Sequence, residues 1–353
     1  MKTRIFSASL ALLLFLLPST GYSQANTPPV GVIVYSLTTG AVTPIGVPVL
    51  GEAVFAGEVS AVTANTLSTT DATWTAGQFA QLGAPYFALI LSGGQTGRLL
   101  LVTGNTAGNA SAIPKIPGSV TLQVGATNLT GDATTPGFAV AAGDRFELFP
   151  GDTLATLFGD GSVNNPVQLQ AGAAAFSADS VQLFNGVKWA SYFFSSTSNS
   201  WVNTIGVQTN QNNVVLPPDT GLLIGRRGPT TTIAITGRAP TTNLVTRIVG
   251  GVTSSVAVRF PTDTTLGALN FSNPGTWVVG DDPAFADRVN LFNGVKWVAY
   301  FKTLTGSIWK QVGGDGSNQS GKVIPAGSSL LIQKQGSAAD SSSFFSQVLP
   351  YTP

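Results

Sequence analysis

One stretch of the sequence decides the fold because it occurs twice. Val181-Gln-Leu-Phe-Asn-Gly-Val-Lys-Trp189 returns further along the chain as Val289-Asn-Leu-Phe-Asn-Gly-Val-Lys-Trp297. The correspondence runs without a gap from residues 181–228 to residues 289–336, with 21 identities in 48 positions. Self-similarity at a fixed spacing indicates that one structural unit has been duplicated. The sequence therefore predicts two copies of a single unit.

Each copy has the signals of a β-meander. An Asn-Gly pair, Asn185-Gly186 or Asn293-Gly294, separates two apolar runs and predicts a tight hairpin turn. With that pair at the centre of the turn, Phe184 faces Val187. A looser second hairpin returns at Trp201. Short β-prone runs interrupted by Gly, Pro or Asn, with no sustained helical period, predict an all-β fold in which the two copies form a pseudo-symmetric sandwich or lie side by side.

The remaining segments complete the expected organisation. The part that precedes the first copy aligns with neither copy, so it is expected to form a separate small β-barrel or sandwich module. The expected divisions are a signal peptide (1–25), the N-terminal β module (26–143), the first repeat unit (144–230), a connecting segment (231–255), the second repeat unit (256–340) and a C-terminal tail (341–353).

The composition excludes several kinds of chemistry. The chain of 353 residues has no Cys, no His and a single Met, which is Met1. Imidazole- and thiol-based catalysis is therefore excluded, as are zinc, haem and iron–sulfur sites. With 17 basic and 16 acidic residues, the chain has a formal net charge of only +1, so nucleic acid is not expected as a partner.

The first 25 residues are typical of a secretory signal peptide. Lys2 and Arg4 precede an apolar stretch from Ile5 to Leu17, and small residues surround the expected cleavage site at Ser23-Gln-Ala25. No later apolar run approaches the length of a membrane span. We therefore expect an exported protein, extracellular or at the cell surface with the periplasm as an alternative, and no membrane insertion once the signal is removed.

Six aromatic residues recur at equivalent positions and are the candidate ligand-binding residues. They are Trp189, Tyr192 and Trp201 in the first copy and Trp297, Tyr300 and Trp309 in the second. Exposed rings on a sheet could stack against sugars of an extracellular polysaccharide. The alternative is that these rings form the core of each unit, and their recurrence in both copies favours the core.

Carboxylates could support a metal site or catalysis. Oxygen-rich loops, such as Asp160–Asn164, Asp281-Asp282 and Asp315–Asn318, leave calcium possible, but no cofactor is expected. Two aspartate pairs, Asp152/Asp263 and Asp179/Asp287, recur in the two copies, which favours turns or caps over a catalytic pair. No catalytic residues are assigned.

Three further motifs look catalytic but lack the required context. Asp219-Thr-Gly resembles an aspartic-protease triplet, yet Gly327 occupies its position in the second copy. Ser307–Lys310 and Gly316–Lys322 lack the helices that a Ser/Lys dyad or a phosphate-binding loop needs. These segments are therefore expected to be turns, loops and strands.

The repeated frame also resembles a known group of proteins. Val-x-Leu-Phe-x-Gly-x-x-Trp-x-x-Tyr-Phe, followed by Leu216-Pro-Pro-Asp-Thr-Gly221, is similar to a family of uncharacterised secreted proteins with many paralogues in Verrucomicrobia and relatives. Trp74-Thr-Ala-Gly-Gln-Phe79 and the segment 86–94 fit the same resemblance. It implies secretion but no activity. The end at Tyr351-Thr-Pro353, without a sorting tail, suggests release or surface association.

These observations lead to three hypotheses of function. The first is a non-enzymatic structural or cell-surface protein that self-associates through exposed strand edges. The second is a carbohydrate-binding or adhesin-like protein that uses the repeated aromatic residues. The third is a polysaccharide hydrolase that uses two carboxylates.

Overall fold

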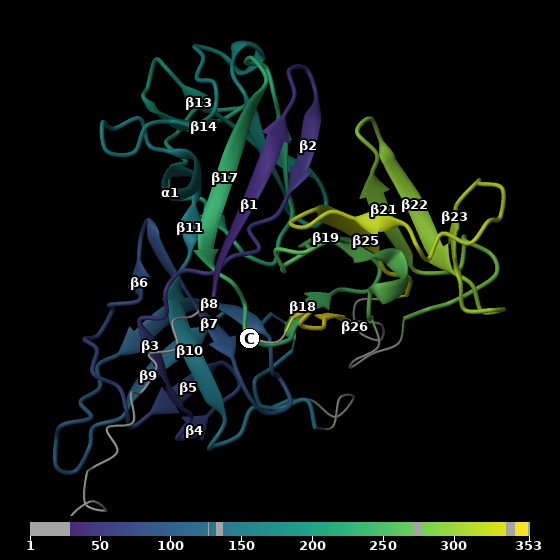
Figure 1. Ribbon diagram of the computed structural model, residues 1–353. Coiled ribbons are helices and arrows are strands. Elements are labelled where there is room, and N and C mark those ends of the chain that lie inside the picture. The colour runs from purple at the N-terminus through teal and green to yellow at the C-terminus, as the bar shows by residue number, and fades with distance from the viewer. Residues whose placement is uncertain (1–28, 126, 132–136, 272–276, 337–342, 352–353) are drawn as a thin grey trace, which may run out of the picture.

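The computed structural model describes residues 29–125, 127–131, 137–271, 277–336 and 343–351. The expected signal peptide lies outside these residues. As predicted, the fold is all-β; the described residues form antiparallel sheets and a single short α-helix. Figure 1 shows three parts: a teal and green part with the purple strands β1 and β2, a blue part below it, and a green to yellow part beside both.

The first part, which we call the first half, is built around one five-stranded sheet. The strands of this sheet, in order, are β14 (Ser200–Asn203), β13 (Trp189–Ser195), β12 (Ser180–Phe184), β16 (Leu222–Gly225) and β2 (Val42–Ile45). Two further antiparallel pairs complete it, namely β1 (Val30–Leu37) with β17 (Thr231–Arg238) and β11 (Asp152–Thr153) with β15 (Val215–Leu216). The helix α1 (Leu154–Phe158) follows β11, and the 3-10 helix η1 (Ala175–Ser177) precedes β12.

The second half repeats this arrangement strand for strand. Its five-stranded sheet has the order β23 (Trp309–Gln311), β22 (Trp297–Lys302), β21 (Arg288–Phe292), β25 (Ser329–Gln333) and β19 (Thr253–Ala257). The two further pairs are β18 (Leu244–Ile248) with β26 (Ser343–Gln347) and β20 (Thr264–Thr265) with β24 (Val323–Ile324). The 3-10 helix η2 (Leu266–Ala268) occupies the place of α1.

The two halves meet across a local two-fold axis. Leu222 pairs with Ile45 as its counterpart Leu330 pairs with Val256, so Gly46 corresponds to Ala257. The N–H of Gly46 donates to the carbonyl of Gly327, and the N–H of Ala257 donates to the carbonyl of Asp219 at 3.0 Å. Asp219 and Gly327 are also counterparts, so the two hydrogen bonds are symmetry-equivalent contacts between the halves. The halves are therefore arranged like the two protomers of a symmetric dimer.

The third part is inserted into the first half, and this differs from the expected division at residues 26–143. Strands β1 and β2 pair with β17 and β16, so residues 30–45 belong to the first half. In the second half, only a short link separates β19 from β20, whereas about a hundred residues separate β2 from β11. The connecting segment (231–255) and the tail (341–353) also differ from expectation, because they supply β17, β18 and β26.

The insert (residues 51–150) forms an eight-stranded half-barrel. The main path of the sheet is β3 (Phe55–Glu58), β10 (Arg145–Pro150), β7 (Ala84–Ile90), β8 (Leu99–Thr106), β9 (Gly118–Leu122), β5 (Thr66–Thr69) and β4 (Ala61–Val62), with β6 (Ala80–Gln81) paired to β7. Trp74, Phe79 and Phe146 are buried in its core. A small cluster that includes Phe87 of the insert and Leu244 and Phe260 of the second half joins the parts.

The first hairpin of each repeat was predicted correctly, but its turn is displaced by one residue. Phe184 lies opposite Trp189, and the N–H of Asn185 donates to the carbonyl of Lys188 at 3.0 Å. The turn is therefore centred on Gly186-Val187. The side chain of Asn185 accepts from the N–H groups of Val187 and Lys188, which keeps Asn185 outside the centre. Gly186 has φ of 94° and occupies the first central position, where this kind of turn requires glycine.

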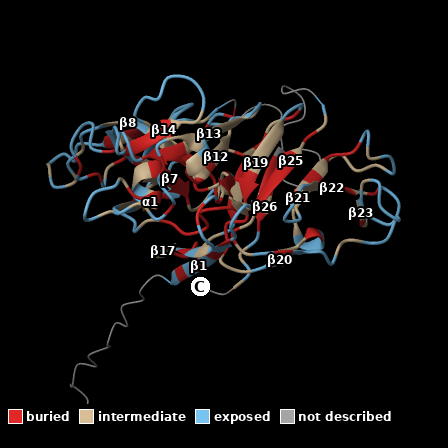
Figure 2. Cartoon of the chain, turned by 90° about the horizontal axis from the view of Figure 1, so that it is seen from above, coloured by how far each residue is buried: buried red, intermediate tan, exposed pale blue. Residues whose placement is uncertain are grey.

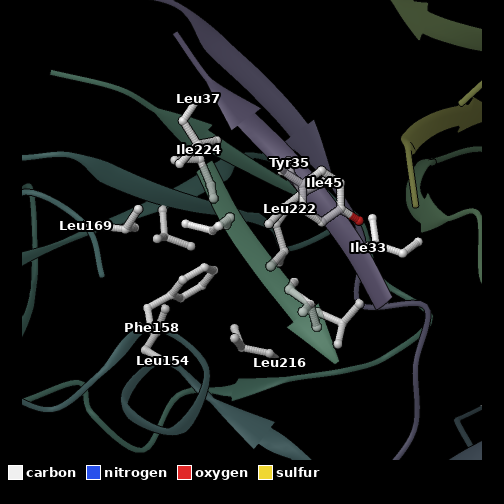
Figure 3. Packing of buried hydrophobic residues seen from close by; sticks show 14 of the residues in the cluster. Ile33, Tyr35, Leu37, Ile45, Leu154, Phe158, Leu169, Leu216, Leu222 and Ile224 are labelled. Atoms are coloured by element: carbon white, nitrogen blue, oxygen red, sulfur yellow. The ribbon is translucent and has the colours of Figure 1, made fainter. Parts of the chain in front are cut away.

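Each half has its own apolar core. Figure 3 shows the core of the first half. Phe158 of α1 lies on one side of this core, Ile33 and Tyr35 of β1 lie on the opposite side, and Leu222 of β16 lies between them. The Tyr35 hydroxyl donates to the carbonyls of Gly46 (2.8 Å) and Gly327 (3.0 Å), so this core reaches the two-fold axis.

Candidate functional site

The six repeated aromatic residues do not share one environment. Trp201 and Trp309 are buried in the two cores, with exposed fractions of 0% and 2%. The indole Nε1 of Trp201 donates to the carbonyl of Gly159 at 2.8 Å. Tyr300 is also buried, and Tyr192 is half-buried against the core of the first half; burial raises the pKa of both phenols. These four side chains pack the interior.

Trp189 and Trp297 remain partly accessible at the tips of the first hairpins. Each packs against its cross-strand neighbour, Phe184 at 5.2 Å and Phe292 at 5.4 Å between ring centroids. Aromatic pairs at such positions stabilise a hairpin. The expected aromatic set is thus divided between two cores and two hairpin tips.

Asp179 and Asp287 are buried caps, in agreement with the sequence-based interpretation. Asp179 forms an ion pair with Arg226, and it also accepts from the N–H groups of Gln170, Arg227 and Gly228. Its counterpart Asp287 pairs with Lys334 at 2.8 Å and accepts from the N–H groups of Val278 and Gln335. Both carboxylates are fully buried, and each is held by one basic side chain and by backbone N–H groups of its own half.

Asp152 and Asp263 are not counterparts, although the sequence suggested it. In the short ladders Asp152 lies opposite Leu216, and Thr264 lies opposite Ile324. Leu216 and Ile324 are equivalent, so Asp152 corresponds to Thr264 and the alignment shifts by one residue. Asp152 therefore has no carboxylate counterpart in the second half.

The oxygen-rich loops use their carboxylates for local turns. Asp160, Asp281 and Asp315 accept from the N–H groups of Ser162, Thr305 and Ser317, at 2.9 to 3.1 Å. These hydrogen bonds lower the pKa of each carboxyl. Within the part of the chain that the structure describes, three or more possible metal ligands do not gather anywhere.

Asp219 lies in a turn between β15 and β16 at the junction of the three parts. Burial raises the pKa of its carboxyl, and the nearby Arg259 and Arg98 partly offset this effect. Ser307 has φ of 50° in the loop before β23, and Lys322 lies in the turn before β24. The three catalytic-looking motifs are thus turns, loops and strand residues.

The ribbon β1–β17 differs from its counterpart β18–β26 in what covers it. Val30, Val32 and Val34 on the outward face of β1 are 73%, 55% and 62% exposed. Figure 2 shows the ribbon at the margin of the molecule. In the second half, Phe344 on the same outward face packs against Phe138 of the insert, with centroids 4.4 Å apart. The insert covers one ribbon and leaves the other bare.

The covered ribbon is also hydrogen-bonded along its edge. The N–H of Val245, the counterpart of Val34, donates to the carbonyl of Gly97 in the insert at 2.9 Å. Gly97 has φ of 86°, and a Cβ there would lie 2.1 Å from the carbonyl oxygen of Asn243. A glycine is therefore required for the insert to approach β18 so closely.

The corresponding edge of β1 is open. Arg238 exchanges two backbone hydrogen bonds with Leu50, so its N–H and C=O groups point away from β1. The N–H and C=O groups of its ladder partner Val30 therefore point away from β17. By the alternation of an antiparallel pair, those of Val32 and Val34 point away from β17 as well. Among the described residues, the N–H and C=O groups of Val32 and Val34 have no hydrogen-bond partner. The sequence showed a strand here, but its free edge depends on strands that are distant in sequence.

Comparisons with known proteins do not extend this description. The chain matches no family model, no curated protein and no solved structure. In the described residues, no helix is both long and apolar enough to cross a membrane. The site must therefore be interpreted from its own geometry.

Proposed function

We propose that this protein is an extracellular structural protein whose copies associate through the free edge of β1. The observation that carries this proposal is the difference between the two ribbons. The edge of β18 is paired with the insert through Val245, whereas the same edge of β1 exposes unpaired backbone groups and three valine side chains. Unpaired strand edges of this kind add a further strand readily.

The surface around the edge favours a second copy of the chain as the partner. The outward side chains are Val30, Val32, Val34, Ser36, Thr232, Ala234 and Thr236, none of which is charged. The chain as a whole has a formal net charge of only +1, so two copies repel one another weakly. Without charged side chains the edge offers little to attract a charged partner.

An antiparallel pairing of β1 with β1 satisfies the free groups on both copies. It would produce a continuous four-stranded sheet with the order β17, β1, β1 and β17. Val32 and Val34 of the two copies would lie on one face of this sheet as cross-strand apolar neighbours, which stabilises a pair of strands. The arrangement is isologous, as most homodimers are.

The test is the concentration dependence of mass in solution, measured by light scattering on the chain from residue 26 onward. The unchanged chain is expected to associate, and Val34→Lys or Val32→Lys to shift it toward the monomer, because a charge on an edge strand opposes pairing. Val187→Lys is the matched control, since Val187 is 86% exposed at a hairpin tip. At a concentration where the unchanged chain is monomeric, all three variants are expected to unfold at the same temperature as that chain.

Two results would contradict the proposal. One is a monomer at every concentration of the unchanged chain. The other is association that survives both β1 substitutions unchanged, which would place the contact on another surface.

A further inference from the structure

A cavity of about 430 Å³ lies on the other side of the β1–β17 ribbon. Its walls come from the free edge of β17, from α1 and from the two links to the insert. Its charged and hydroxyl-bearing residues are Glu52, Asp152, Thr156, Thr236 and Arg238. This is within the size range of small-ligand sites. The cavity shares no residue with β1, so a ligand bound there would not depend on self-association through that strand.

The second half has the same cavity with a different lining. That cavity, of about 250 Å³, lies between the equivalent segments of β26 and η2. At the positions of Asp152 and Thr156 it has Thr264 and Ala268, as the short ladders and the capping threonines Thr153 and Thr265 place them. The duplicated cavity has thus kept its place in both halves. The second cavity has a carboxyl of its own, Asp263, which accepts from the N–H of Ala326 at 2.8 Å, whereas the first has the hydrogen-bonded Asp152 and Thr156 at the positions of Thr264 and Ala268.

The β17 wall of the cavity offers unpaired backbone groups. The backbone N–H and C=O groups of Arg238 point away from β1. By the alternation of an antiparallel pair, those of Ala234 and Thr236 also point away from β1, toward the cavity that these residues line. Among the described residues, neither has a hydrogen-bond partner on that side. In the second half, Ser346, the counterpart of Ala234, donates its N–H to the carbonyl of Asn270 at 2.8 Å. This strand edge is thus hydrogen-bonded at Ser346 in the second half, whereas the equivalent edge at Ala234 is unpaired in the first half.

The side chains add both acceptors and a donor. The hydroxyl of Thr156 donates to Oδ1 of Asp152 at 3.1 Å, and burial raises the pKa of Asp152. Glu52 is exposed at the rim. Arg238 is 6% exposed and paired with Glu147, yet its Nε lacks a hydrogen-bond partner within the described residues. Because this atom is closed to solvent, the guanidinium belongs to the buried pair with Glu147. The donors open to a ligand are the hydroxyls of Thr156 and Thr236 and the backbone N–H groups of β17.

We propose that this cavity binds a neutral saccharide of one or two rings. Each sugar hydroxyl both donates and accepts, which suits a wall of mixed backbone N–H and C=O groups together with the carboxyl groups of Glu52 and Asp152 and the hydroxyl of Thr156. The acidic pair Glu52 and Asp152 opposes a phosphate or another anion. An extended peptide could also use the β17 edge, but among the described β17 residues that line the cavity, Ala234 and Thr236 alone offer free backbone groups, because those of Arg238 are paired with Leu50. The proposed site differs from the repeated aromatic residues.

The experiment is a titration of the folded chain with glucose, galactose, mannose, N-acetylglucosamine and their β-linked disaccharides, followed by calorimetry and by thermal stabilisation. At least one of these probes is expected to bind and to raise the melting temperature. Asp152→Thr and Glu52→Gln should each weaken binding by about tenfold or more, the effect of losing a hydrogen bond to a charged group. Glu58→Gln, on the exposed surface of the insert, is the matched control.

Asp152→Thr is suited to this test because threonine is the residue at the equivalent position of the second half. The variant is therefore expected to fold, and an unchanged melting temperature without sugar confirms it. Three results would overturn the proposal: no binding of any probe at millimolar concentration, binding that both substitutions leave unchanged, or a preference for the tripeptide Ala-Lys-Ala over every saccharide.

Discussion

Replacing Asp179 by asparagine tests how the buried caps stabilise the two halves. The carboxylate is fully buried, pairs with Arg226 and accepts from three backbone N–H groups. Asn offers one acceptor oxygen in place of two, and its amide group would face donors. It also leaves the guanidinium of Arg226, which is 7% exposed, without its counter-ion. Breaking a buried pair on one side costs about 3–5 kcal/mol of unfolding free energy.

The assay is denaturant unfolding at neutral pH, supported by thermal unfolding, where this loss lowers the melting temperature by about 10 °C. Asp71→Asn is the matched control, because Asp71 and Lys115 form an exposed pair that is 48% and 52% accessible. It is expected to cost less than about 1 kcal/mol. Asp287→Asn should behave like Asp179→Asn, since Asp287 has the same position in the second half.

The double variant Asp179→Asn/Arg226→Met separates two explanations. If the cost comes mainly from an unpaired buried charge, removing that charge should recover about 2 kcal/mol. The reasoning is refuted if Asp179→Asn costs no more than Asp71→Asn. It is also refuted if the second substitution adds its own loss in full.

Three further predictions concern other parts of the fold. Gly221→Ala should destabilise the contact between the halves by about 1–3 kcal/mol, because a Cβ there would lie 1.9 Å from Oγ of Ser329, and adding Ser329→Gly should restore most of the loss in denaturant unfolding. Trp201→Phe should cost about 1–3 kcal/mol through the unsatisfied carbonyl it leaves, while Trp189→Phe at a hairpin tip should cost less than about 1 kcal/mol; equal costs would contradict the division into core and tip. Burial raises the pKa of Asp152, so its contribution to the free energy of unfolding is fully present below the ordinary aspartate pKa and is lost as the pH rises through the raised value. Asp152→Asn should flatten the dependence of unfolding free energy on pH in this range. An unchanged slope would count against this assignment.

Much of the local structure could be predicted because its causes lie within a few residues. The duplicated frame predicted both hairpins and the equivalence of Trp201 and Trp309, and a residue present in both copies is more simply explained as core than as half of a site. The turn was misplaced by one residue because the side chain of Asn185 caps the turn from outside, an interaction that competes with the preferred Asn-Gly conformation.

The candidate sites were less accessible to such reasoning. Val30–Leu37 is recognisable as a strand, but whether its edge is free depends on Gly97, which covers only the counterpart strand β18. The cavity beside Asp152 could not be foreseen, since its walls come from segments on both sides of the insert. Its polar character becomes visible only when the short ladders correct the alignment of Asp152 with Asp263.

The sequence by itself determined the all-β class, the duplication, and the residues that fill or cap each unit, because periodicity and turn chemistry act locally and the second copy repeats the signal. Only the tertiary structure decided that Val42–Ile45 completes the sheet of Leu222–Gly225, that the half-barrel is an insert, and that it covers one ribbon while the edge of the other stays open. The physical reason is that backbone hydrogen bonds between strands are the same for every residue type. The choice of partner strand therefore depends on how distant segments pack, which no local pattern specifies.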